Sequence, residues 1–179
     1  MLPFFGGTME LKLLFCDEVN TREELENKLK ELDINFEYKL GVIGMIIDKN
    51  NKVVYQRRGP KASGDYNKLS DMGGAVEDED LTFKEALIRE LREECGNEFN
   101  VEIDSFICAF NKNYFDNRLQ KQINRIFLVY KLNYVDGEFL INEPGKALGY
   151  EWYDVDEIPV AEVMESTLFI NNLYLKSNK

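Results

Sequence analysis

Three glutamates near the middle of the chain have the types and spacing to bind a divalent cation. Glu90 and Glu94 are four residues apart, and Glu93 follows Glu90 by three residues. On a helix, these spacings place all three carboxylates on one face within two turns, where like charges repel. A bound Mg²⁺ or Mn²⁺ would reverse that cost, because hard cations take carboxylate, water and phosphate oxygens as ligands. The cluster therefore predicts a metal site, and a solvated acidic helix is the simpler alternative.

The residues around the glutamates define the helix that must carry them. Thr82 is followed three residues later by Glu85, which is the spacing of a capping box. Gly96 is suited to the position just after the last turn. These signals predict a helix from about Phe83 to Cys95.

This segment resembles the Nudix box, G-x5-E-x7-R-E-U-x-E-E-x-G-U, in which U is a bulky aliphatic residue. The matching residues are Gly74, Arg89, Glu90, Leu91, Glu93, Glu94 and Gly96. The chain is thus similar to the Nudix hydrolases, the MutT-like pyrophosphohydrolases. The resemblance implies an α/β fold in which a mixed β-sheet lies inside an α/β/α sandwich.

The box departs from the family pattern in the loop before the helix. Fourteen residues separate Gly74 from Arg89, where the pattern has thirteen. The first acid of the box is therefore open between Glu79 and Asp80. Met72 stands where these proteins often have proline.

The resemblance also implies roles for the box residues. Glu90, Glu93, Glu94 and the carbonyl of Gly73 are expected to bind the metal. Arg89 is expected to orient a glutamate through a bidentate pair. The metal would activate a water molecule and stabilise the leaving oxygen. The sequence contains no histidine, so Glu94 or Glu90 is the expected general base.

A second acid is expected from outside the box. The run Asn142-Glu143-Pro144-Gly145-Lys146 resembles a segment of Nudix enzymes that cleave nucleoside triphosphates. Glu143 is the candidate and Glu138 the reserve. A surface loop that turns at Pro144 and Gly145 is the alternative.

Substrate phosphates need cations, and four lie close together before the box. Arg57, Arg58, Lys61 and Lys68 cluster in an otherwise acidic chain. We take Arg57, Arg58 and Lys61 as candidate substrate-binding residues. Ordinary solvation of a polar loop is the alternative reading.

Composition limits the other partners. The net charge of −11 argues against a nucleic-acid footprint and against an anionic membrane surface. Three irregularly spaced cysteines make a disulfide framework or a zinc site unlikely and favour a reducing cytoplasm. A small nucleotide-type substrate fits this balance, and the oligomeric state, a homodimer included, is open.

The remaining patterns predict the elements in chain order. A strand at 11–15 and a helix that follows the capping box Thr21–Glu24 and ends near Asp33 form an extension, residues 1–35, packed on a Nudix domain, 36–179. Residues 1–8 carry no fold argument. Strands are expected at 40–47 and 53–55 as a hairpin, then at 101–110, 123–134 and 150–153, before a closing helix at 160–175.

The expected activity is metal-dependent hydrolysis of a phosphoanhydride bond. The substrate would be a nucleoside diphosphate linked to another moiety, with nucleoside triphosphates, cleaved to release pyrophosphate, included. The alternative is a catalytically silent Nudix-fold domain that senses nucleotides. The three clustered carboxylates favour the enzyme, because a binding module does not need them.

Overall fold

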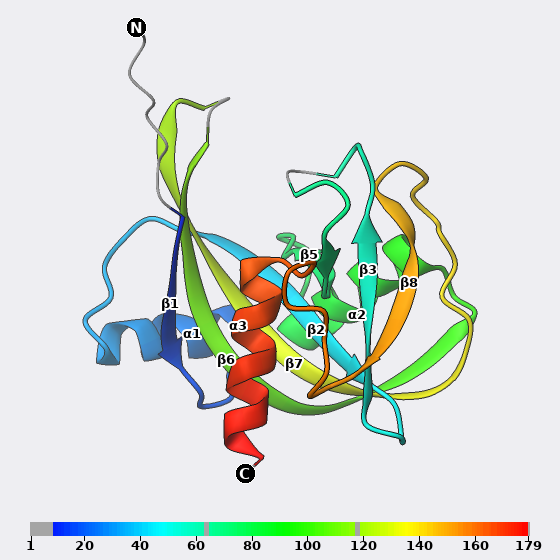
Figure 1. Ribbon diagram of the computed structural model, residues 1–179. Helices are drawn as coiled ribbons and strands as arrows, with labels where there is room; N and C mark the ends of the chain where they lie inside the picture. Colours follow the sequence, from blue (N-terminus) through cyan, green and yellow to red (C-terminus); the bar gives the residue numbers. More distant parts are fainter. Residues whose placement is uncertain (1–8, 63–64, 117–118, 179) are drawn as a thin grey trace, which may run out of the picture.

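The computed structural model describes residues 9–62, 65–116 and 119–178. Its centre is an eight-stranded mixed sheet with the order β1-β6-β7-β2-β3-β4, to which β5 adds by pairing with β2 and β8 by pairing with β3 (Figure 1). The strands are β1 Glu10–Phe15, β2 Lys39–Ile47, β3 Lys52–Arg58, β4 Leu69–Ser70, β5 Met72–Ala75, β6 Phe99–Asp116, β7 Lys121–Gly137 and β8 Ala147–Asp154. The helices are α1 Arg22–Glu31, α2 Phe83–Cys95 and α3 Glu165–Ser177.

Helices cover both faces of the sheet, and each face has its own apolar core. Ile126, Leu128, Tyr130 and Leu132 of β7 pack in a cluster that includes buried residues of α1 and α2. Phe127 and Val129, which point to the opposite face, pack in a cluster that includes residues of α3. Alternation along one strand thus fills two layers of core. The predicted α/β class and mixed sheet are confirmed.

Strand β2 positions the glycine pair of the box. It runs parallel to β7 on one side. On the other side its first half pairs with β5 and its last two residues with β3. Gly73 and Gly74 lie on β5, opposite Ile43 and Val42. The predicted hairpin of β2 and β3 is present, and the side chain of Asp48 closes its turn.

The two capping boxes predicted from the sequence are both formed. Thr21 and Glu24 cap α1, and Thr82 and Glu85 cap α2. Gly96 ends α2 at a φ of 78°, a conformation that suits glycine. The bounds of α2 agree with the prediction.

The closing helix begins later than predicted. We expected it from residue 160, and α3 begins at Glu165. The segment before it is held in an extended form, because Val163 forms a bridge with Leu69 and the Met164 amide donates to the Leu69 carbonyl. Strands β6 and β7 are longer than predicted, and β4 and β5 were not predicted at all.

The strand and helix predicted near the N-terminus are present as β1 and α1. Strand β1 pairs antiparallel with β6, so it belongs to the main sheet. Residues 1–8 lie outside the described part of the chain. Among the described residues, none of the helices is both long and apolar enough to cross a bilayer.

Candidate active site

Helix α2 presents its three glutamates at graded depth. The side chain of Glu93 is 57% exposed and that of Glu90 is 14% exposed. Glu94 lies deeper still, and burial raises the pKa of its carboxyl to about 7. The charges of Glu90 and Glu143 act in the same direction. The three carboxylates therefore run from solvent into the body of the protein along one helix face.

The glycine pair of the box, Gly73 and Gly74, has no side chains, and this allows the carboxylates of α2 to lie close to the backbone of β5. The Gly73 amide donates a hydrogen bond to Glu94 Oε2 over 3.3 Å. A Cβ atom on Gly74 would lie 2.1 Å from Glu90 Oε2, and one on Gly73 would lie 2.0 Å from the Val42 carbonyl oxygen. Gly73 also has a φ of 148°. The site therefore requires glycine at both positions.

Arg89 ties the acidic loop to the helix. Its Nε and Nη2 donate to the two oxygens of Asp80 over 3.0 and 2.8 Å. Its Nη1 donates to Glu90 over 2.9 Å and to Glu93 over 3.2 Å. The Asp80 side chain is only 8% exposed, and its hydrogen bonds with Arg89 lower the pKa of its carboxyl. The bidentate partner of Arg89 is thus Asp80.

Two residues that the sequence did not single out hold the C-terminal end of α2. Asn142 Nδ2 donates to the Glu93 carbonyl over 2.8 Å, and the Asn142 amide donates to the Glu94 carbonyl over 3.2 Å. The Tyr150 hydroxyl donates to the Glu94 carbonyl over 3.3 Å. The last carbonyls of any helix need such partners, but no local pattern says which distant residues supply them.

The loop with Glu143 lies beside the buried end of this face. Glu143 forms an ion pair with Lys146 at 2.6 Å. The negative charge of Glu143 helps to raise the pKa of the Glu94 carboxyl. The loop is fixed against the segment after β3, since the Lys61 amide donates to the Gly145 carbonyl over 2.8 Å. Glu138 is anchored elsewhere, its amide bonded to the Glu98 carbonyl.

The three candidate substrate cations have different surroundings. Arg57 pairs with Glu151 at 2.6 Å and with Glu162 at 2.9 Å, so its charge is already neutralised. Arg58 lies within the electrostatic reach of Glu94, and burial lowers the pKa of its guanidinium. Lys61 is exposed beside the Glu143 loop. The structure therefore places Arg58 near Glu94 and Lys61 beside the Glu143 loop, while Arg57 forms internal ion pairs.

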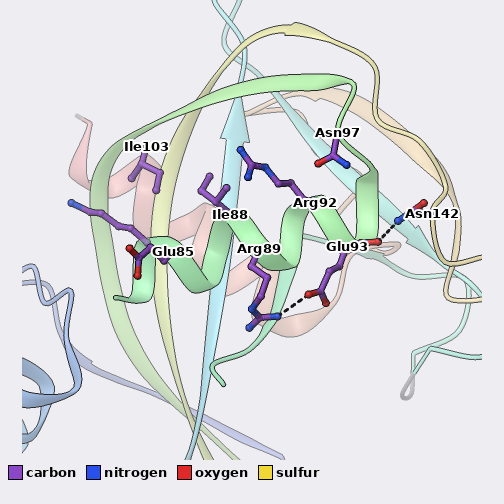
Figure 2. Close-up of a pocket in the computed structure, with 9 residues that line it drawn as sticks. Glu85, Ile88, Arg89, Arg92, Glu93, Asn97, Ile103 and Asn142 are labelled. Carbon is purple, nitrogen blue, oxygen red and sulfur yellow. Dashed lines mark hydrogen bonds and ion pairs between the residues drawn. The ribbon is translucent and has the colours of Figure 1, made fainter. Parts of the chain in front are cut away.

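A groove of about 670 Å³ follows the outer flank of α2. Figure 2 shows Arg89 and Glu93 pointing toward one another on one side of the helix. Ile88 and Arg92 point to the other side, toward Ile103. The groove thus reaches the acidic face at Glu93, its most exposed member.

Comparison with known proteins identifies the fold and the family. The NUDIX domain model matches residues 37–169, most of the chain. The chain belongs to the Nudix family. The resemblance read from the box is confirmed, and the chain is a Nudix hydrolase. No curated protein matches the sequence.

Solved Nudix structures share the fold at low identity. A MutT NUDIX hydrolase from Burkholderia pseudomallei superposes with a TM-score of 0.60 at 18% identity, over 77% of this chain and 98% of the other. The MutT protein from Methanosarcina mazei Go1 gives a TM-score of 0.60 at 20% identity, over 81% and 100%. The NUDIX domain of Shewanella oneidensis NrtR, solved with ADP ribose, gives 0.59 at 15% identity, over 82% and 92%.

Nudix hydrolases generally use divalent metal ions, and the donors of this site suit such ions. All are oxygens. Burial, and then the neighbouring charges of Glu90 and Glu143, make ionisation of the Glu94 carboxyl harder, a cost that a cation would remove. Across the described residues, no three acidic or thiol side chains already converge as a metal cluster. Arg89 holds Glu90 and Glu93, and the Gly73 amide holds Glu94, so ion binding requires these contacts to be exchanged.

Proposed function

We propose that this Nudix hydrolase cleaves a phosphoanhydride bond in a nucleoside diphosphate linked to another moiety, with nucleoside triphosphates included, and that it depends on Mg²⁺ or Mn²⁺. The observation that carries the proposal is the packing of Glu90 and Glu94 against Gly74 and Gly73. The structurally similar NrtR domain was solved with ADP ribose. A UDP-X diphosphatase also shares the fold, with a TM-score of 0.54. Both support a diphosphate-linked nucleotide as substrate.

The proposed roles follow the geometry. Glu90, Glu93, Glu94 and the Gly73 carbonyl would hold the metal, which supplies charge neutralisation and an activated water. Glu94, with a pKa of about 7, is suited to accept a proton near neutral pH, and Glu90 is the alternative base. Arg89 positions the glutamates from its pair with Asp80, which we propose as the first acid of the box.

Residues outside the box complete the proposed site. Glu143 is the proposed additional acid, since its charge reaches Glu94. Arg58 and Lys61 are the proposed contacts to substrate phosphates. Arg57 is less suited to bind substrate phosphates, because its guanidinium group already forms ion pairs with Glu151 and Glu162.

The test is hydrolysis of a nucleotide panel by the purified protein. ADP-ribose, NADH, nucleoside triphosphates and dinucleoside polyphosphates are assayed with Mg²⁺, with Mn²⁺ and with EDTA. We expect Glu93→Gln and Glu94→Gln each to lower kcat/KM at least about a hundredfold, the range that removal of an acid–base group gives. Glu102→Gln, an exposed acid on β6, is the matched control and should keep wild-type rates.

Unchanged rates in both variants would refute the assignment. Tight binding of ADP-ribose by calorimetry, without turnover and without metal dependence, would instead support the silent sensing domain.

Three wider properties are proposed on indirect grounds. A cytoplasmic location is consistent with three free cysteines. The absence of nucleic-acid partners is proposed from the net charge of −11. The division into an extension, 1–35, and a Nudix domain, 36–179, and a homodimeric state remain predictions.

A further inference from the structure

The first turn of the glutamate helix α2 is held by a residue that lies far before it in the sequence. The Phe83 amide donates to the Asn20 carbonyl over 2.9 Å, and the Lys84 amide donates to Asn20 Oδ1 over 3.0 Å. The next amide, that of Glu85, donates to Thr82 Oγ1 over 3.1 Å. The first amides of a helix have no acceptor within the helix. Asn20 therefore supplies two acceptors that α2 itself cannot provide.

Asn20 is in turn fixed by the start of α1. Its amide donates to Glu24 Oε2 over 2.6 Å, and the same carboxylate oxygen accepts from the Thr21 amide in the capping box of α1. The preceding carbonyl, that of Val19, accepts a hydrogen bond from the buried Tyr130 hydroxyl over 2.7 Å. The N-terminus of α1 thus sets the position of Asn20, and Asn20 sets the N-terminus of α2.

Arg22, the first residue of α1, reaches the acidic loop before α2. Its Nη2 donates to the Glu77 carbonyl over 2.9 Å and lies 3.7 Å from Asp78 Oδ1. The Asp78 side chain is fully exposed, so this ion pair contributes little, and the bond to the carbonyl is the specific contact. Alongside the hydrogen bonds from Arg89, the charge of Arg22 also lowers the pKa of the Asp80 carboxyl.

The loop connects Arg22 to the glutamates of α2. The Glu77 carbonyl also accepts from the Asp80 amide over 3.2 Å, and the Glu77 amide donates to Asp80 Oδ2 over 2.8 Å. Asp80 pairs with Arg89, and Arg89 donates to Glu90 and Glu93. A displacement of the Glu77 carbonyl would therefore pass through Asp80 and Arg89 to the exposed half of the acidic face.

We propose that Asn20 and Arg22 are positioning residues of the hydrolase. Asn20 fixes the first turn of α2, and Arg22 fixes the acidic loop, so that Asp80 and Arg89 hold the glutamates in their working arrangement. Both residues precede residue 37, where the match to the family begins, so the box alone does not supply these contacts. The effect on catalysis rests on the proposed function, whereas the ordering of the loop and of the first turn does not.

The first experiment measures amide hydrogen exchange in EDTA, without nucleotide. Arg22→Met keeps the aliphatic stem and removes the donor, and it should speed exchange of the Glu77 and Asp80 amides. Asn20→Ala should speed exchange of the Phe83 and Lys84 amides. We expect each change to be at least about threefold, as the loss of a capping or anchoring group predicts.

Two further variants make the exchange measurement specific. Asn20→Asp keeps an acceptor at the helix N-terminus, so its first turn should exchange as in the wild type. Lys30→Gln, which changes an exposed cation in the last turn of α1, is the matched control for Arg22. Unchanged exchange of the loop in Arg22→Met, or of the first turn in Asn20→Ala, would overturn the role of that residue.

The second experiment measures kcat and KM with Mg²⁺ and a hydrolysed nucleotide. Arg22→Met should lower kcat at least about tenfold and change KM less than about twofold, because misplaced groups act on the chemical step. Arg22→Lys, which keeps a cation and a donor, should recover part of kcat. Lys30→Gln should keep wild-type values.

A double-mutant cycle separates positioning from a general loss of structure. If Arg22 acts through Asp80, the double variant Arg22→Met/Asp80→Asn should have the same kcat as Asp80→Asn alone. Additive losses, or faster exchange without any fall in kcat, would overturn the positioning role. If no nucleotide of the panel is hydrolysed, the proposed function fails, and the exchange measurement still decides whether Asn20 and Arg22 fix the box.

Discussion

Arg89 uses its whole guanidinium group, and this explains why a lysine could not replace it. The group donates to both oxygens of Asp80, to two glutamates of α2 and to the Ala75 carbonyl. A planar fork can make these bonds together, whereas an ammonium group acts as a point charge. Arg89 thereby fixes the loop before α2 and the exposed half of the acidic face as one unit.

Asp80 and Glu79 are adjacent acids with opposite expected importance. Asp80→Asn removes the charge that faces Arg89, and we expect it to lower the free energy of unfolding by about 1–3 kcal/mol and to lower kcat/KM. Glu79→Gln, the matched control, should change both by little, since surface substitutions cost about 0.5 kcal/mol or less. Urea unfolding and the hydrolysis assay measure the two quantities. The reverse order would assign the first box acid to Glu79.

Asp71 is a second residue for which we expect a measurable effect, here on the pH dependence of stability. Both of its carboxylate oxygens are buried. Burial raises the pKa of this carboxyl from 3.8 to about 7, against a smaller opposing effect of Thr167. Because the folded-state pKa is the higher one, protonation of Asp71 stabilises the fold at low pH. That stabilisation is lost as the pH rises through the folded-state pKa.

Asp71→Asn should therefore be more stable than the wild type in alkaline buffer. The difference should open above about pH 4 and level off above about pH 7, at a size on the order of 4 kcal/mol. Chemical unfolding of both proteins in EDTA from pH 4 to 8.5 measures it. A constant difference across that range would show that Asp71 does not titrate with the fold.

At the scale of helices and strands, sequence patterns predicted the boundaries that are set by contacts between residues close in sequence. The capping boxes and Gly96 gave the bounds of α2 because each cap is made within one turn of the helix. The start of α3 is set instead by Leu69, which lies far away in the sequence and holds residues 163–164 in an extended form. Strands β4 and β5 are two and four residues long, too short for an alternating pattern.

The same division applies to the site. The glutamates of α2 could be found from spacing, because helical geometry alone places them on one face. The contacts of Asn142 and Tyr150 with the end of α2 could not be found in this way, because they depend on strand register and loop packing. Strand β6 also shifts register three times along β7. A sequence pattern read without those shifts does not give the cross-strand partners.

At the scale of the whole molecule, the sheet and the shared core join parts that the sequence suggested were separate. Helix α2 with its glutamates packs on one face of the sheet, and β5, which carries the glycine pair of the box, joins that sheet by pairing with β2. The N-terminal strand extends that sheet, and α1 contributes to the core that α2 also covers. The extension is therefore expected to unfold together with the domain that carries the active site.

Leu25 provides the test, because it is completely buried in the core shared by α1 and α2. Leu25→Ala should lower the free energy of unfolding of the whole protein by about 2–5 kcal/mol, in a single transition seen alike by circular dichroism and by the fluorescence of Trp152. Leu32→Ala is the matched control, since Leu32 follows the same helix and is 43% exposed. Two separate unfolding transitions, with Leu25→Ala shifting only the one of smaller amplitude, would instead establish residues 1–35 as an independent unit. If the core is shared, the loss of Leu25 must destabilise both parts together.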